Sequence, residues 1–300
     1  MARMTKKSQK FPGPRSFAAY REDARNWITL AGGEFYPDIL PEACELYKPV
    51  LVLFGQILER SESSQALFMN ICALRETWMR IQLARVFRKY VSPAMPVEML
   101  KGKSKAADIC TQFGVTFRPI AQVQAAFHSR PIPDEALCAI MWEYKDRGKK
   151  GYDLTEKFFA LIRQQLPDIV IKGPERAGKD ILLGSIWPNF KRPKHPVDFI
   201  IERDDRLLAV GFARYDGDRG GAQEDDRPGG YLGACNEVLA YAVTKKTRKV
   251  KLIFLNDGPG LLLGSMWNDY AALEQLGKGR IMVCTLRMVP ERITLEWLES

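Results

Sequence analysis

The residues best suited to chemistry lie between Pro196 and Arg227. Asp198 opens an apolar segment two residues after a proline, and five acids gather further along, at 216–226. These acids are Asp216, Asp218, Glu224, Asp225 and Asp226. Mg²⁺ and Ca²⁺ prefer oxygen ligands, and Mg²⁺ commonly uses one or two carboxylates together with water and phosphate. The stretch is therefore a candidate metal site for phosphodiester cleavage. The alternative is a solvated loop in which arginines pair with the acids.

Two predicted strands, 197–202 and 207–215, must position these acids, with a tight turn at 203–206 between them. Side chains alternate between the two faces of a strand, so Arg214 and Asp216 are predicted to project together, with Asp218 next if the chain stays extended. Asp198 reaches them if the two strands are neighbours. Two carboxylates then hold the metal, and Arg214 offsets the charge that develops on the phosphorus.

The charge balance favours a partner that carries phosphate. The 300-residue chain has a net charge of +9. Its basic residues gather at 1–30, 145–150, 191–195 and 245–251, whereas acids concentrate at 216–226. A basic protein with one acidic pocket is typical of a nuclease, because the wide surface attracts phosphates and the pocket holds a metal. Charge alone fits a merely basic soluble protein equally well.

Other classes of protein are disfavoured by what the chain lacks. No apolar run is long enough to span a membrane, and the basic N-terminus lacks the apolar core of a secretion signal. The 6 cysteines contain no Cys-x-x-Cys pair, so we expect reduced thiols in a cytoplasmic protein. Neither 173–179 nor 256–260 matches a phosphate-binding loop, so ATP is not expected. We interpret 256–260 as a tight turn, with DNA contact as the alternative.

Hydrophobic periodicity predicts an α/β protein with a mostly helical first half. Helices are expected at 41–60, 63–90, 134–148, 155–166, 231–243 and 266–276, and Pro49 should break or kink the first of them. Residues 104–128 resemble a helix–turn–helix in outline, although two packed core helices are the favoured interpretation. Strands are expected at 169–173, 180–187, 197–202, 207–215, 249–256 and 280–286. We therefore expect a mixed central sheet flanked by helices in residues 151–300. Residues 1–150 should form a helical region for gripping DNA or for dimerisation.

At this point the chain resembles a known superfamily. A Pro-x-Asp strand, a turn, a second strand ending in acids and then a helix are similar to the PD-(D/E)xK nucleases, in particular type II restriction endonucleases. The segments ARYDGDRGGAQEDDR and NDGPGLLLGSMWNDY also resemble blocks of restriction enzymes. The resemblance covers about residues 155–290. It implies a restriction-endonuclease-like core, Asp198 as the first acid of the motif, and cleavage of double-stranded DNA with Mg²⁺.

The second half of the motif departs from this pattern. In register, the second strand offers Gly211-Phe212-Ala213 or Phe212-Ala213-Arg214, and neither frame contains a carboxylate followed by lysine. Three explanations remain open. In the first, Asp216 and Asp218 form an acid-x-acid variant. Alternatively, Glu224 or Glu237 supplies the second metal ligand while Arg214 replaces the lysine. In the third, cleavage activity has been lost.

Several residues near the acids are candidates for contact with DNA. Gln223 suits adenine and Arg227 suits guanine, whereas Arg219, Lys191 and Arg192 add positive charge. We expect a homodimeric, sequence-specific endonuclease that matches a palindromic DNA site. One alternative is a non-catalytic DNA-binding protein that keeps the nuclease fold. The other is a metal-dependent hydrolase of a small phosphoester.

Overall fold

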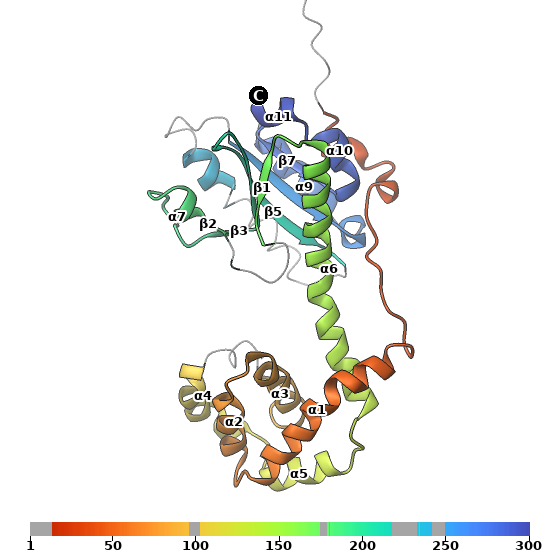
Figure 1. Ribbon diagram of the computed structural model, residues 1–300, viewed down its shortest axis with the longest axis vertical. Coiled ribbons are helices and arrows are strands. Elements are labelled where there is room, and N and C mark those ends of the chain that lie inside the picture. Colours follow the sequence, from red (N-terminus) through yellow and green to blue (C-terminus); the bar gives the residue numbers. More distant parts are fainter. Residues whose placement is uncertain are drawn as a thin grey trace, which may run out of the picture. The chain divides into compact units, whose positions relative to one another are not determined.

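The computed structural model describes residues 14–95, 103–174, 179, 181–217, 233, 235–241 and 250–300; for 103 and 146–152 it describes the backbone alone (Figure 1). The chain divides into two compact units. One is Gly33–Arg147, and the other comprises the described residues on both sides of it. Within the described ranges, none of the helices has the length and apolar character needed to cross a membrane.

The unit Gly33–Arg147 is helical, as expected for this part of the chain. Its helices are α1 (Leu40–Glu59), α2 (Ser64–Ala73), α3 (Thr77–Tyr90), α4 (Ala106–Phe113), α5 (Ile120–His128) and the first part of α6 (Glu135–Gln165), with short 3₁₀ turns η4 (Lys103–Lys105) and η5 (Gly114–Thr116). These helices are labelled in Figure 1. Their buried apolar side chains form one core. Phe54, Phe68 and Phe87 are fully buried in it. The helices at 104–128 contribute to this core, in agreement with the favoured interpretation.

Some helix boundaries differ from those expected. Helix α1 continues through Pro49. The single helix expected at 63–90 is two helices, because the Glu76 carboxylate caps α3 by accepting hydrogen bonds from the backbone N–H groups of Trp78 and Met79. Conversely, the helices expected at 134–148 and 155–166 are one continuous α6. A glycine in a helix costs only about 1 kcal/mol relative to alanine, so the flanking helical residues carry the helix through Gly148 and Gly151.

The α/β unit contains a five-stranded mixed sheet, so the predicted α/β class with a mixed central sheet is confirmed. The strand order is β1 (Val170–Lys172), β4 (Phe199–Arg203), β5 (Arg206–Tyr215), β6 (Lys251–Asp257) and β7 (Ile281–Cys284). The pairs β1/β4 and β4/β5 are antiparallel, whereas β5/β6 and β6/β7 are parallel. A separate small sheet pairs β2 (Ile181–Leu182) with β3 (Pro196–Val197). The strand expected at 180–187 is therefore short, and α7 (Leu183–Ile186) follows it directly.

The hairpin of β4 and β5 forms as predicted. Asp204 and Asp205 connect the strands with φ values of 49° and 58°. Two successive positive φ values are typical of the type I′ turn, whose twist suits a two-residue hairpin. Aspartate tolerates this left-handed region better than most residues. The predicted adjacency of the two strands is confirmed.

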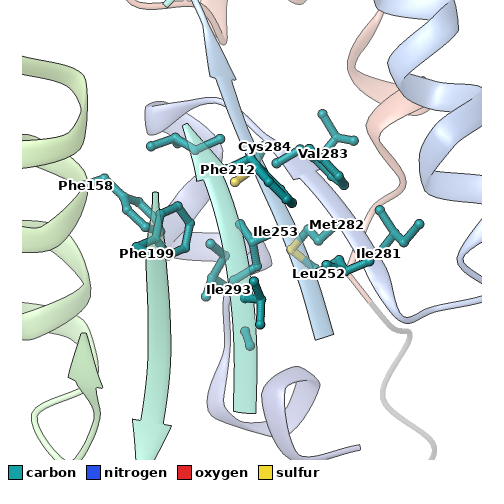
Figure 2. Close-up of a cluster of buried hydrophobic side chains, with 14 of the residues drawn as sticks. Phe158, Phe199, Phe212, Leu252, Ile253, Ile281, Met282, Val283, Cys284 and Ile293 are labelled. Carbon is teal, nitrogen blue, oxygen red and sulfur yellow. The ribbon is translucent and has the colours of Figure 1, made fainter. Parts of the chain in front are cut away.

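Helices flank the sheet and complete its core. Phe158 of α6 packs against Phe199 of β4, with ring centroids 4.8 Å apart (Figure 2). Every residue of β7 is buried. α9 (Met266–Leu276) and α10 (Val289–Arg292) contact β7, and α11 (Leu295–Glu299) contacts β5. Residues 251–300 also contain the 3₁₀ turns η7 (Pro259–Leu262) and η8 (Leu286–Met288).

Residues 14–32 pack in the α/β unit, although they precede the helical unit in the chain. They contain η1 (Phe17–Tyr20) and η2 (Ala24–Asn26). Phe17 stacks on Trp267 of α9 with ring centroids 4.4 Å apart, and both side chains are buried. The two compact units therefore do not coincide with the halves 1–150 and 151–300.

Candidate functional site

Asp198 lies directly before β4 and is fixed to the neighbouring strand. Its backbone N–H donates to the carbonyl oxygen of Gly211 (3.0 Å), and its Oδ2 accepts a hydrogen bond from the N–H of Ala213 (2.8 Å). Both partners belong to β5, an internal strand of the sheet. The half-buried carboxylate is therefore held beside the end of β5 that carries Arg214.

Arg214 and Asp216 contact each other, as the two-residue period of a strand predicts. The distance from Arg214 Nε to Asp216 Oδ1 is 2.9 Å. The Asp216 side chain is only 1% exposed, whereas the Arg214 side chain is 35% exposed. The carboxylate is therefore the inner member of the pair, and the guanidinium is the member that solvent reaches.

The predicted turn is a bend at Gly258, between the end of β6 at Asp257 and the start of η7 at Pro259, and the segment 257–260 holds Asp216. The N–H of Asp216 donates to the carbonyl oxygen of Asp257 (2.7 Å), and the Asp216 carbonyl accepts from the N–H of Gly260 (2.8 Å). Gly258 has φ 111°, and a Cβ there would lie 2.4 Å from the Asp216 carbonyl oxygen. Glycine is therefore required at this position, both by its backbone conformation and by the close approach of β5.

The described acids do not by themselves make a complete metal site. Within the described part of the chain, no three His, Cys, Asp or Glu side chains gather in a way that could hold a metal ion. Asp198 and Asp216 are as many carboxylates as Mg²⁺ commonly uses. However, Asp216 Oδ1 is bound by Arg214, which would have to release it. The other two predicted members, Asp218 and Glu224, lie outside the described residues.

Two further predicted residues pair with each other. Arg192 Nε lies 2.5 Å from Glu237 Oε2, so the arginine considered for DNA contact neutralises the acid considered as an alternative metal ligand. Lys191 beside it is exposed. The remaining predicted contacts to DNA, Arg219, Gln223 and Arg227, lie outside the described residues.

His195 belongs to the same neighbourhood, and sequence reasoning gave it no role. Its ring lies 6.1 Å from the ring of Phe212, between centroids. Burial lowers the pKa of His195 below its usual value, the positive charge of Arg192 lowers it further, and the negative charge of Glu237 raises it. The feature of the sequence that could have identified His195 is its position, three residues before Asp198.

Asp257 was also missed, and it serves the structure of the site. Its Oδ1 accepts hydrogen bonds from the N–H groups of Thr29 (2.6 Å) and Gly258 (2.7 Å), and its Oδ2 accepts from the N–H of Leu286 (2.9 Å). Burial raises the pKa of the Asp257 carboxyl, although these backbone donors lower it. One buried side chain thus joins the end of β6 to two distant segments. The signal was the pair Asn256-Asp257 at the end of an apolar run.

The polar side chains gather where β5 and β6 end. Asp198 is hydrogen-bonded to β5, Arg214 lies near the end of that strand and Asp216 directly after it, and Asn256 is paired with Arg214 in the register of β5 and β6. Carboxylates can hold a cation and a guanidinium can bind an anion, and phosphoester cleavage needs both. Comparison of the chain with protein-family models, with curated proteins and with solved structures finds no match in any of the three.

Proposed function

We propose that the chain is a Mg²⁺-dependent endonuclease of the type II restriction class with a PD-(D/E)xK core, and that it cleaves double-stranded DNA at a specific sequence. The observation that carries the proposal is the position of Asp198. Its carboxylate is fixed to the N–H of Ala213, the residue before Arg214. Asp198, directly before β4, is therefore hydrogen-bonded to the end of β5, where Arg214 and Asp216 lie.

The order of the elements supports the proposal. Pro196 and Asp198 precede β4, a two-residue turn leads to β5, and β5 ends at the pair Arg214–Asp216. Helical residues 235–241 follow, and β6 then runs parallel to β5. This is the plan that the resemblance to the nuclease superfamily implies.

Each residue has a distinct proposed role. Asp198, together with Asp216 or Glu224, holds Mg²⁺, which supplies a bound water of lowered pKa. Arg214 binds the phosphate and offsets its developing charge. Arg214 Nε now donates to Asp216 Oδ1. The guanidinium must therefore move from this carboxylate to the phosphate, so that Arg214 can bind the phosphate and Asp216 can bind the metal.

A small surface of the helical unit, formed by Arg85, Arg88 and Tyr144, is the proposed contact for the DNA backbone. Within it, the guanidinium of Arg85 lies over the ring of Tyr144 at 5.1 Å, and Arg88 Nη2 lies 3.4 Å from the Tyr144 hydroxyl. Two guanidiniums at one phenol create a positive potential that suits a phosphate. A homodimer would place two such surfaces on a palindromic site.

A non-catalytic DNA-binding protein with this fold is the second candidate. It is favoured by the residues that stand in place of the acid-x-lysine half of the motif. Phe212 is 7% exposed, and its ring stacks on that of Phe254 at 5.3 Å between centroids. The inner part of β5 is thus aromatic where a metal-binding acid would be expected.

Digestion of phage DNA with and without Mg²⁺ tests the proposal. We expect the wild-type protein to cut at defined sites only with the metal. Asp198→Asn should cleave at least about 100-fold more slowly, because the loss of one group that stabilises charge in the transition state has an effect of this size. Asp204→Asn is the matched control, because this carboxylate lies at the turn end of the same hairpin and is 93% exposed. It should cut normally.

The outcomes separate the two candidates. Binding of DNA without cleavage at any Mg²⁺ concentration would favour the non-catalytic protein. Normal cutting by Asp198→Asn would show that the proposed site is wrong, even if the protein is a nuclease.

A further inference from the structure

Asn256 is a buried amide whose polar atoms lack partners in the described part of the chain. It is 0% exposed, and neither its Nδ2 nor its Oδ1 makes a hydrogen bond to any described residue. Buried polar groups are normally hydrogen-bonded, because burying one without a partner costs free energy. An apolar residue would pack at this position without that cost. The amide therefore indicates a hydrogen bond that forms in another state of the protein.

The register of the sheet identifies the nearest functional neighbour. Arg214 of β5 and Asn256 of β6 are paired residues on parallel strands, which lie about 4.8 Å apart. Two residues earlier in both strands, the paired rings of Phe212 and Phe254 stack at 5.3 Å. Because side chains two residues apart share a face, Arg214 and Asn256 project from the same face of the sheet as these rings.

Arg214 is the member of the site that has to move. Its Nε now donates to Asp216 Oδ1, and its side chain is 35% exposed. When the guanidinium leaves Asp216 to bind a phosphate, it loses the acceptor that orients it. The Oδ1 of Asn256 is a neutral acceptor in register with Arg214, and it can orient the guanidinium without competing for its charge.

We propose that Asn256 is a positioning residue for Arg214. In the DNA-bound state, the guanidinium donates one hydrogen bond to Asn256 Oδ1 and others to a phosphate oxygen of the DNA backbone. In the free protein, Arg214 pairs with Asp216 and the amide is unused. This inference rests on the proposed function, since it takes a DNA phosphate as the ligand.

A double-mutant cycle on the full chain tests the coupling. Binding of a fluorescent mixed-sequence DNA duplex is measured in Ca²⁺ for the wild type, Asn256→Leu, Arg214→Gln and the double variant. We expect each single substitution to weaken binding about tenfold, which is about 1.4 kcal/mol. The double variant should bind no more weakly than Arg214→Gln, because the amide acts through the guanidinium.

Thermal unfolding without DNA distinguishes a positioning residue from an asparagine that only stabilises the fold. Leucine has the same branching and the same number of heavy side-chain atoms as asparagine but no polar group, so Asn256→Leu should unfold at the wild-type temperature or above it. If leucine does not pack, Asn256→Ala should show the same loss of DNA affinity.

Two results would overturn the inference while leaving the proposed function intact. These are normal DNA binding by the Asn256 variants and additive losses in the double variant. If the wild-type protein binds no DNA in Ca²⁺ or Mg²⁺, the proposed function itself fails and this inference fails with it.

Discussion

Gly211 and Phe199 are direct partners across β5 and β4, and the Phe199 ring fills the space where a side chain at position 211 would lie. A Cβ built on Gly211 would be 2.0 Å from two ring carbons of Phe199. The ring is held there by Phe158 of α6 (Figure 2). In this packing, no acid fits at position 211. The departure of β5 from the acid-x-lysine pattern is therefore built into the core of the sheet.

Replacing this glycine should disturb the core. Gly211→Ala forces the Phe199 ring to move, and overpacking of this kind costs about 1–3 kcal/mol of the free energy of unfolding. Urea denaturation of both proteins measures the difference. Gly233→Ala is the matched control, because it lies at a helical position with no atom within 4 Å of the new Cβ. It should be as stable as the wild type or more stable by up to about 1 kcal/mol. Equal stability of Gly211→Ala and the wild type would show that the ring moves freely.

The hairpin could be predicted from the sequence because its signals are local. Alternating side chains define β5, and Asp204-Asp205 provides the turn. The contact between Arg214 and Asp216 follows from the same period of two. These inferences need only a few adjacent residues.

The helix boundaries and the rest of the site depend on contacts that local patterns do not contain. Glu76 ends the run 63–90 through a capping interaction, and α6 joins two segments that glycines separate in the sequence. Asn256 becomes a candidate only once the register pairs it with Arg214, and His195 only once it lies beside Phe212. Long-range strand pairing sets the first relationship, and the packing of the segment at β3 against β5 sets the second.

A buried ion pair should contribute strongly to the stability of the α/β unit. Glu274 accepts hydrogen bonds from Arg292 Nη2 at 2.9 and 2.8 Å, and also from the N–H groups of Phe17 (2.7 Å) and Val283 (2.9 Å). The Arg292 side chain is 2% exposed. Glu274→Gln leaves this charge buried without its counter-charge, so we expect a loss of about 3–5 kcal/mol in the free energy of unfolding.

Glu202→Gln is the control for that experiment. It removes the same charge from a pair in which the Lys172 side chain is 55% exposed. An exposed ion pair contributes only about 0–1 kcal/mol, so the change should be small. Equal losses in both variants, measured by denaturation at the same pH, would contradict a special role for the Glu274–Arg292 pair.

His195 should make the stability of the protein depend on pH. Burial lowers its pKa in the folded protein, so the unfolded chain binds a proton at a higher pH than the folded chain does. The stability contribution is therefore complete above the unfolded pKa of about 6.5 and is lost as the pH falls from there toward the folded pKa. His195→Gln should reduce this dependence in unfolding curves recorded between pH 7 and pH 5.

The neighbours of His195 give the titration a direct test. Arg192 lowers the pKa and Glu237 raises it, so Arg192→Gln should raise the pKa of His195 and Glu237→Gln should lower it. NMR titration of the imidazole measures both shifts. Movement in the same direction in both variants would show that the pair acts on His195 through packing rather than through charge.

Arg85 and Arg88 should contribute to DNA binding through charge. Each phosphate contact that is lost lowers the slope of log Kd against log salt by about 0.9, so Arg85→Gln/Arg88→Gln should reduce the slope by about 2. Arg60→Gln/Arg75→Gln is the control, because it removes the same charge from two exposed positions of the helical unit. If both double variants reduce the slope equally, the two pairs of arginines contribute alike and the contact at Tyr144 has no special role. If only the first does, DNA phosphates bind where the two guanidiniums meet at Tyr144.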